Sequence, residues 1–300
     1  MHDLTIVIPS YNHSSYVLEC IESAIAVSIE SKRILVIDDG STDDTINVVS
    51  NYLESIQSDI VELIVKENKG LVDSLNLGLE KANSKYIYFI ASDDIIIPSG
   101  IMELFNRMQN NESIDFIIGG GYSINEKNEK REIYRKCHFA FFELDNVSIR
   151  EEIYTGHPTP ILIQTTLYRT KILREVGGFD RDLKFDDYPL FIKLITNNSE
   201  NGKTTHFLND IKVAYYRQHD NNASRSIERQ FLMSKDVYLK LAPKDLLNLS
   251  MSNCLAFYFL FALKNKKLKS AFFLLKHLKK NYVIFFIAEI YRILINRKNL

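Results

Sequence analysis

The sequence is poor in the residues that build disulfide frameworks and zinc sites. Its 300 residues include only three cysteines, Cys20, Cys137 and Cys254, and no two of them form a CxxC pair. An odd number without that spacing argues against a disulfide framework and against a zinc site. Unpaired cysteines fit a reducing compartment, so the sequence predicts a cytoplasmic protein.

An excess of positive charge is also missing. The chain has 37 lysines and arginines against 38 aspartates and glutamates, a formal net charge of -1. This balance lacks the strong positive field of a nucleic-acid binder, and we expect no nucleic-acid partner. No basic leader precedes the first apolar run, at residues 4–8, so a secretory signal peptide is not expected either.

Two common phosphate-binding loops are absent. A dinucleotide fold needs GxGxxG after its first strand, and a P-loop needs GxxxxGK followed by Ser or Thr. The nearest fragment, Gly202-Lys203-Thr204, has Asn197 where the leading glycine should stand, and it follows a predicted helix. We interpret it as a turn, so any bound pyrophosphate needs another source of positive charge.

Short apolar, β-branched runs alternate with amphipathic segments over the first 120 residues. The runs lie at 4–8, 34–37, 61–65 and 86–90. Each is followed by a polar turn and a segment with helical periodicity, which predicts repeated βα units around a largely parallel sheet.

This alternation stops after a fifth run at 116–118, which leads into three glycines and a hairpin-like stretch. The elements expected beyond it are strands at 161–168 and 213–216 and a helix at 187–196. From residue 226 the pattern is helical throughout. The sequence therefore predicts an α/β domain with a mixed sheet over residues 1–225 and a helical extension over residues 226–300.

Polar residues follow three of the predicted strands. They are Pro9-Ser10-Tyr11-Asn12, Asp38-Asp39-Gly40 and Ser92-Asp93-Asp94. Ligands of open parallel sheets bind at the carboxyl ends of the strands. There, Asp93 and Asp94 offer hard oxygen ligands for Mg²⁺ or Mn²⁺, and such an ion neutralises a diphosphate. Taken singly, each acidic pair could instead be turn chemistry ahead of a helix.

Several motifs in order resemble those of family 2 glycosyltransferases with the GT-A fold. The matching segments are residues 9–12, 38–43, 68–70, 92–94, 177–180, 185–188 and 216–219. The resemblance covers roughly residues 3–225. It implies a Rossmann-like, mixed but mainly parallel sheet flanked by helices.

The resemblance also implies a role for individual residues. Tyr11 stacks on the base, Asp39 accepts from a uracil-type imide, and Asp94 is the main metal ligand. The other implied nucleotide or donor contacts are Pro9, Asn12, Asp38, Asn68 and Asp93. His219 is implied as a second contact to the metal or the diphosphate, with Asp186 and Arg217 in supporting positions.

Asp187 corresponds to the catalytic base of the family. An acceptor hydroxyl must lose its proton as it attacks the anomeric carbon opposite the diphosphate, and one carboxylate suffices for that step. A single displacement inverts the anomeric centre. Without the resemblance, Asp187 would be interpreted as a helix N-cap and His219 as an ordinary polar residue.

The sequence departs from the family at three points. Ala91 stands where many members have a leading aspartate, and Asp186 replaces the usual glutamate of the catalytic pair. The Gln-x-x-Arg-Trp element of processive synthases is absent, and the chain has no tryptophan. Absence of that element favours transfer of a single sugar, and the resemblance implies a UDP-sugar donor and a glycan or lipid-linked acceptor, in the manner of surface polysaccharide synthesis. Alternatives are a metal-dependent nucleotidyltransferase and a non-catalytic sugar-nucleotide or glycan binding protein.

The last 50 residues are strongly basic. Glu289 is their only acidic residue, against Lys264, Lys266, Lys267, Lys269, Lys276, Lys279 and Lys280. The apolar stretches at 255–263 and 282–288 are shorter than the roughly 20 residues that span a bilayer. Three interpretations stay open: a helical cap on the sheet, a protein interface, or peripheral contact with the inner face of the cell membrane.

Overall fold

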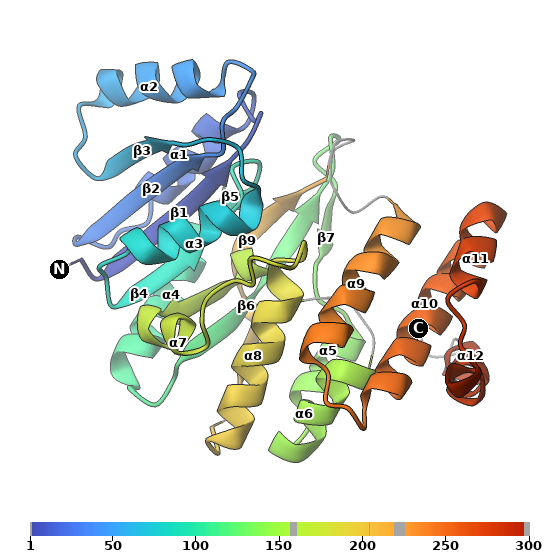
Figure 1. Ribbon diagram of the computed structural model, residues 1–300. Coiled ribbons are helices and arrows are strands. Elements are labelled where there is room, and N and C mark those ends of the chain that lie inside the picture. The colour runs from blue at the N-terminus through green and yellow to red at the C-terminus, as the bar shows by residue number, and fades with distance from the viewer. Residues whose placement is uncertain (1, 157–160, 204, 219–225, 297–300) are drawn as a thin grey trace.

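The computed structural model describes residues 2–156, 161–203, 205–218 and 226–296. Within them, nine strands form one mixed sheet in the order β3-β2-β1-β4-β8-β6-β9-β5, and β7 pairs with β6 off this path (Figure 1). The strands are β1 (Leu4–Ser10), β2 (Lys32–Asp38), β3 (Val61–Val65), β4 (Tyr86–Phe89), β5 (Ile95–Ile96), β6 (Phe116–Ile124), β7 (Lys130–Glu132), β8 (Thr166–Arg169) and β9 (His206–Arg217). Strands β1 to β4 are parallel, as the βα pattern predicts.

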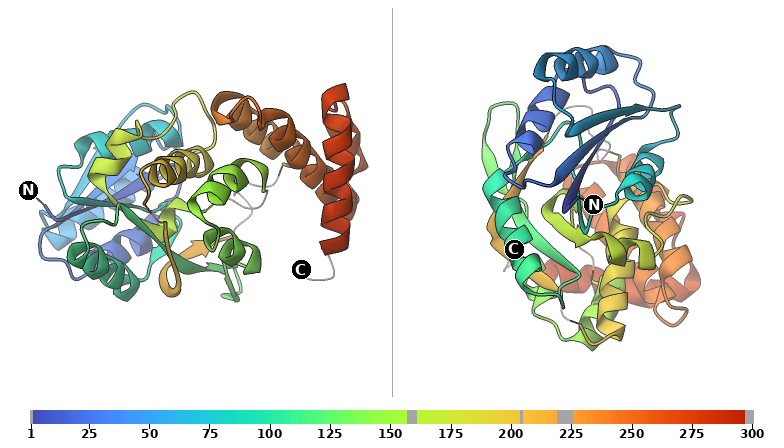
Figure 2. Two further views of the ribbon diagram at one scale, coloured as in Figure 1. Left: turned by 90° about the horizontal axis from the view of Figure 1, so that it is seen from below. Right: turned by 90° about the vertical axis from the view of Figure 1, so that its left-hand side faces the viewer.

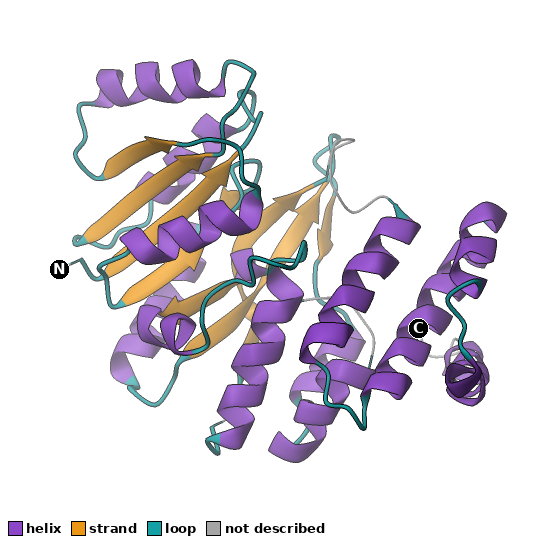
Figure 3. Ribbon diagram, viewed as in Figure 1, coloured by secondary structure: helices purple, strands orange, loops and turns teal. Residues whose placement is uncertain are grey.

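Helices cover both faces of the sheet (Figure 3). The helices are α1 (Val17–Ile25), α2 (Thr45–Ile56), α3 (Leu71–Lys81), α4 (Pro98–Asn110), α5 (Lys136–Phe142), α6 (Asn146–Thr155), α7 (Thr170–Glu175), α8 (Asp187–Glu200), α9 (Ile227–Leu241), α10 (Leu247–Lys264), α11 (Leu268–Leu275) and α12 (Val283–Asn296). Along β1, Ile6 and Ile8 pack in the cluster that contains α1 and α4, whereas Val7 packs in the cluster that contains α3 and α8. Because side chains alternate between faces, a strand buried on both faces must be apolar throughout.

Three predicted strands differ at one end by more than two residues from those observed. The strand expected at 213–216 lies within the last part of β9, which begins at His206. The strand expected at 116–118 continues through its glycines to Ile124 as β6. The glycines are needed because β9 passes very close: a Cβ on Gly120 would lie 2.1 Å from the carbonyl oxygen of Asn209. The strand expected at 161–168 begins instead as a 3-10 turn, η1 (Ile163–Thr165), followed by β8. Leu162 causes this turn, because its carbonyl accepts from both the amide and the hydroxyl of Thr165.

The helical extension has its own apolar core, formed by α9 to α12. It is joined to the rest of the chain by apolar packing, since Val237 of α9 belongs to the core cluster that contains α3 and α8, and by a 2.8 Å hydrogen bond from the Asn253 side chain to the Thr155 carbonyl. Figure 2 shows α12 at the end of the molecule farthest from β1 to β3. The predicted boundary at residue 225 stays a prediction, and residues 219–225 lie outside the described residues.

One described helix, α10, is long and apolar enough to cross a membrane when judged by length and composition alone. Half of it, 50%, is buried inside the structure.

Candidate active site

The carboxyl ends of β1, β2 and β4 meet at one edge of the sheet, as their parallel order requires. Ser10 pairs with Asp38 in register, and its carbonyl accepts from the Asp39 amide at 2.8 Å. The Ser92 amide donates to the Pro9 carbonyl at 3.3 Å. The three polar segments found in the sequence therefore lie side by side.

The Asp93-Asp94 turn is held by residues from distant parts of the chain. One Asp94 oxygen accepts from the Arg217 amide at 2.8 Å, and the other accepts from Gln164 Nε2 at 3.1 Å. The Arg217 side chain donates to the Asp93 carbonyl at 2.8 Å and to Glu19 at 2.6 Å. The supporting position predicted for Arg217 is thus at this turn, where its amide and guanidinium fix both aspartates.

Electrostatics make this turn a fitting cation site. Asp94 is buried, and burial followed by the negative charge of Asp93 raises the pKa of its carboxyl well above the usual value. Arg217 opposes that shift. A divalent ion would favour the charged form of both carboxylates, and their oxygens suit Mg²⁺ or Mn²⁺. Among the residues that the structure describes, no cluster of three or more His, Cys, Asp or Glu side chains surrounds this pair, and His219 lies outside them.

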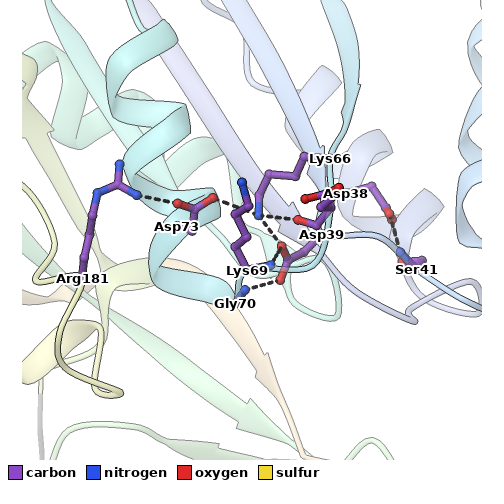
Figure 4. A network of polar contacts seen from close by, with 9 residues as sticks. Asp38, Asp39, Ser41, Lys66, Lys69, Gly70, Asp73 and Arg181 are labelled. Atoms are coloured by element: carbon purple, nitrogen blue, oxygen red, sulfur yellow. Dashed lines mark hydrogen bonds and ion pairs between the residues drawn. The ribbon is translucent and has the colours of Figure 1, made fainter.

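Asp39 is the centre of a buried polar network (Figure 4). Its two carboxylate oxygens accept from the Lys69 amide at 2.9 Å, the Gly70 amide at 2.8 Å and the Lys66 ammonium. Lys66 also pairs with Asp73 at 3.1 Å, and Asp73 pairs with an arginine of the 177–182 segment, Arg181. Asp39 therefore anchors the loop after β3, in addition to the base contact that the resemblance implies.

Asp38 and Asn12 shape the same region through local hydrogen bonds. The buried Asp38 accepts from the Ser41 amide at 2.7 Å and from the Ser41 hydroxyl at 2.6 Å. Asn12, with a φ of 55°, accepts from the Thr42 amide at 2.8 Å. Gly40 has a φ of +71° and lies so close to the next loop that an added Cβ would be 3.0 Å from the Asn68 amide nitrogen. This close approach at Gly40 limits where the Asn68 backbone can lie.

The remaining predicted donor contacts differ in exposure. Pro9 is buried within β1, whereas the Tyr11 ring is 43% exposed beyond its end. Asn68 is exposed on the loop that Asp39 anchors. An exposed aromatic ring beside buried carboxylates is a suitable surface for stacking a nucleotide base.

Asp187 is the first residue of α8, with Asp186 as the N-cap. Neither makes a side-chain cap; one Asp187 oxygen accepts from the Tyr188 amide at 2.8 Å instead. Burial, followed by the charge of Asp186, raises the pKa of Asp187 well above the ordinary carboxyl value. A base of raised pKa is better matched to proton abstraction near neutral pH.

The η1 turn contacts the metal candidate directly. Its residue Gln164 donates to Asp94 at 3.1 Å. The neighbouring Thr165 hydroxyl bonds the Tyr134 hydroxyl at 2.6 Å. Burial, with the charge of Asp187 as a smaller cause, raises the pKa of Tyr134. The buried turn is thus one hydrogen bond from Tyr134, which lies within electrostatic reach of the base candidate.

His13 also lies at this turn, although no sequence motif singled it out. Its Nδ1 lies 2.7 Å from the Ser92 hydroxyl, and its Nε2 lies 4.0 Å from an Asp93 oxygen. Its position directly after the 9–12 motif was the available signal. Histidine at a strand end beside an aspartate is a recognisable candidate for contact with phosphate or donor sugar.

The fold and this acidic edge define an α/β protein with a ligand site at the carboxyl ends of parallel strands. Residues 5–177, more than half of the chain, match the family model described as glycosyl transferase family 2. The chain belongs to that family. Asp187 and Arg217 lie beyond the matched residues.

Relatives among curated proteins are similar over part of their length. An uncharacterized glycosyltransferase of Rickettsia prowazekii is 28% identical over 206 residues, 65% of this chain and 59% of the relative. The glycosyltransferase GlyG of Streptococcus pneumoniae serotype 4 is 31% identical over 124 residues, 41% of this chain and 40% of GlyG. The matches therefore span less than two thirds of these relatives.

Solved structures share the fold at low identity. S. aureus TarS 1-349 in complex with UDP-GlcNAc has a TM-score of 0.63 and 19% identity, covering 96% of this chain and 79% of that one. The mannosyltransferase PcManGT of Pyrobaculum calidifontis, in complex with GDP-Man and Mn²⁺, has a TM-score of 0.61 and 15% identity, covering 97% and 84%. The chain thus has the GT-A fold expected from its motifs.

Proposed function

We propose that this protein transfers a single sugar from a nucleotide diphosphate donor, a UDP-sugar, to an acceptor hydroxyl with inversion. The observation that carries the proposal is the meeting of the Asp93-Asp94 turn and the Tyr11 loop at one sheet edge, where Gln164 of η1 bonds Asp94 and the adjacent Thr165 bonds Tyr134, within electrostatic reach of Asp187. The nucleotide-sugar complexes of the two structural neighbours support a donor of this class.

Each part of the donor has a matching group. In this proposal the exposed Tyr11 ring stacks on the base, and Asn68, on the loop that Asp39 anchors, contacts the nucleotide or the donor sugar. Asp93 and Asp94 would hold a Mg²⁺ or Mn²⁺ ion, with His219 as a further ligand. When bound, the ion supplies positive charge that stabilises the leaving diphosphate.

The chemistry requires one proton transfer. The acceptor oxygen forms a bond to the anomeric carbon while the bond from that carbon to the diphosphate oxygen breaks, and the diphosphate leaves with the electron pair. Asp187 takes the acceptor proton. Because attack and departure occur on opposite faces of the sugar, one displacement inverts the anomeric centre.

The natural acceptor is proposed from the resemblance of the motifs. A glycan or a lipid-linked sugar, used in surface polysaccharide synthesis, is the acceptor class that this resemblance favours. Absence of the Gln-x-x-Arg-Trp element supports addition of one sugar per acceptor.

The experiment is incubation of the protein with a panel of UDP-, GDP- and other sugar nucleotides and Mn²⁺, scoring release of the nucleotide diphosphate. The best donor is then tested with Asp94→Ala and Asp187→Asn and with metal removed by a chelator. Release that depends on metal and on Asp94, and that Asp187→Asn abolishes while donor still binds, is the expected result. An NMR assignment of the product anomer tests inversion.

Other outcomes favour the alternatives. Release of inorganic pyrophosphate with transfer of the nucleotide would indicate a nucleotidyltransferase. Donor binding without turnover in any acceptor mixture, unchanged by Asp187→Asn, would indicate a binding protein. Turnover of a GDP-sugar and not of a UDP-sugar would change only the proposed identity of the base.

A further inference from the structure

The outermost helix of the extension carries apolar residues on both sides. Phe286 and Glu289 face the protein interior, where Phe286 packs in the extension's apolar core. The opposite side presents Ile284, Ile287, Tyr291 and Leu294, which are exposed and spaced by three or four residues. A helix that is apolar all round is normally buried on every side, so this side lacks its cover in the described structure.

A neighbouring helix repeats the arrangement. Along α11, Leu268, Phe272 and Leu275 are exposed at the same spacing, and Phe272 is 68% exposed. We call these residues, together with the exposed stripe of α12, the apolar end face; both helices lie at the same end of the molecule (Figures 1 and 2). Two exposed apolar stripes at the same end of the molecule favour an interaction surface there.

The charge around the apolar end face selects its occupant. Lys279 and Lys280 are exposed and immediately precede α12, while Lys269 and Lys276 are exposed on or directly beside α11. The only acidic residue of 251–300, Glu289, is buried and paired with Arg292 at 2.6 Å. The lysines therefore keep their positive charge without a neighbouring acidic side chain from this segment, and they complement a surface of anionic headgroups.

We propose that the apolar end face docks on the surface of an anionic membrane, with its aliphatic and aromatic side chains entering the headgroup layer. The helix α12 has 14 residues and is about 21 Å long at 1.5 Å per residue, too short to cross a hydrocarbon core of about 30 Å. It lies along the interface instead. The compartment predicted from the cysteines is the cytoplasm, where the membrane leaflet is anionic.

The inference does not rest on the proposed activity. It does give that activity a location, because docking at the far end leaves the acidic sheet edge open to solvent-borne donor. Its test is co-sedimentation of the whole chain with phosphatidylcholine vesicles, with and without phosphatidylserine, at low and high salt. Nucleotide-sugar turnover without vesicles is followed in parallel, so that loss of docking and loss of activity are told apart.

The structure offers a matched pair of variants. Ile284 on α12 is 79% exposed and Val147 on α6 is 80% exposed, so glutamate at either position leaves the core intact. Ile284→Glu combined with Tyr291→Glu is expected to abolish binding to phosphatidylserine vesicles, whereas Val147→Glu is expected to bind as the parent protein does. Thermal unfolding of all variants checks that the fold is retained.

Charge variants test the attraction between the exposed lysines and anionic headgroups. Lys279→Gln and Lys280→Gln are each expected to lower the partition coefficient about fivefold, and salt of about 1 M is expected to weaken binding further. The proposal is overturned if the parent protein ignores anionic vesicles at low salt, or if the Ile284 and Tyr291 variant still binds. A dimer that this variant disrupts, without vesicle binding, would assign the face to a second copy and also overturn it.

Discussion

Removal of the Asp39 carboxylate is expected to destabilise the fold measurably, because the side chain satisfies two backbone amides and a lysine. Asp39 and Lys66 are 7% and 14% exposed, and the amides of Lys69 and Gly70 have this carboxylate as their acceptor. A hydrogen bond to a charged group contributes about 1.5 kcal/mol or more, and breaking a buried ion pair costs about 3–5 kcal/mol. Lys66 keeps Asp73 at 3.1 Å, so its charge is not left unpaired. We therefore expect Asp39→Ala to cost about 3 kcal/mol, the lower end of that range.

The assay is urea unfolding followed by circular dichroism at neutral pH. Asp44→Ala is the matched control, since Asp44 is exposed, makes no N-cap hydrogen bond and lies in the same turn region. It is expected to change stability by no more than about 0.5 kcal/mol. If Asp39→Ala costs no more than the control, the anchoring role assigned to Asp39 is wrong.

UDP binding distinguishes the role of Asp39 as a loop anchor from its proposed contact with the base. If Asp39 also accepts the imide of the base, Lys66→Met removes one of the two donors to its Oδ1 and is expected to maintain or tighten UDP affinity, measured by calorimetry. Asp39→Ala is expected to weaken it. Equal loss in both variants would show that Lys66 itself contacts the nucleotide.

Three other perturbations have defined outcomes. Asp187→Asn should abolish turnover yet raise the melting temperature at neutral pH. A carboxyl whose pKa is raised on folding contributes stability below its unfolded pKa, and this stability is lost as the pH rises through the folded pKa. Asparagine carries no such charge, so the variant avoids the cost of a buried carboxylate. Asp186→Asn should move the acid limb of the kcat profile to lower pH, because it removes the second cause of the raised pKa of Asp187; an unmoved limb would exclude Asp187 as the titrating base. Gly120→Ala should cost about 2–3 kcal/mol in urea unfolding, since its Cβ would lie 2.1 Å from the Asn209 carbonyl oxygen. Gly202 has a φ of +70°, and a Cβ added there would meet no described atom within 4 Å beyond its chain neighbours, so Gly202→Ala should cost only about 1–2 kcal/mol. Equal costs for Gly120→Ala and Gly202→Ala would refute the steric argument.

Much of the site could be predicted from the sequence because its parts are local. Strands β1 to β4 are short apolar runs, and the polar residues that follow them must lie at one edge once the strands are parallel. The start of α8 at Asp187 is likewise where the pattern placed it. The order of motifs then identified the family, and the match over residues 5–177 confirms it.

Other contacts join residues that no local pattern relates. Arg217 and Asp94 are 123 positions apart, and Gln164 and Asp94 are 70 apart. The Arg217 contact depends on how β9 pairs with β5 and β6, including the register shifts at the glycines of β6, and the Gln164 contact depends on how β8, which follows η1, pairs with β4 and β6. A one-residue change of register would turn these side chains to the other face of the sheet.

What the sequence determined by itself was therefore the set of elements, the family and the carboxylates available for chemistry. Only the tertiary structure decided that Asp39 anchors a loop, that Gln164 of η1 bonds Asp94 and that one side of α12 is apolar and exposed. The physical reason is the range of the interactions. Periodicity and strand-end composition are set by near neighbours in the chain, whereas burial, pKa shifts and long-range hydrogen bonds depend on which distant segments pack together.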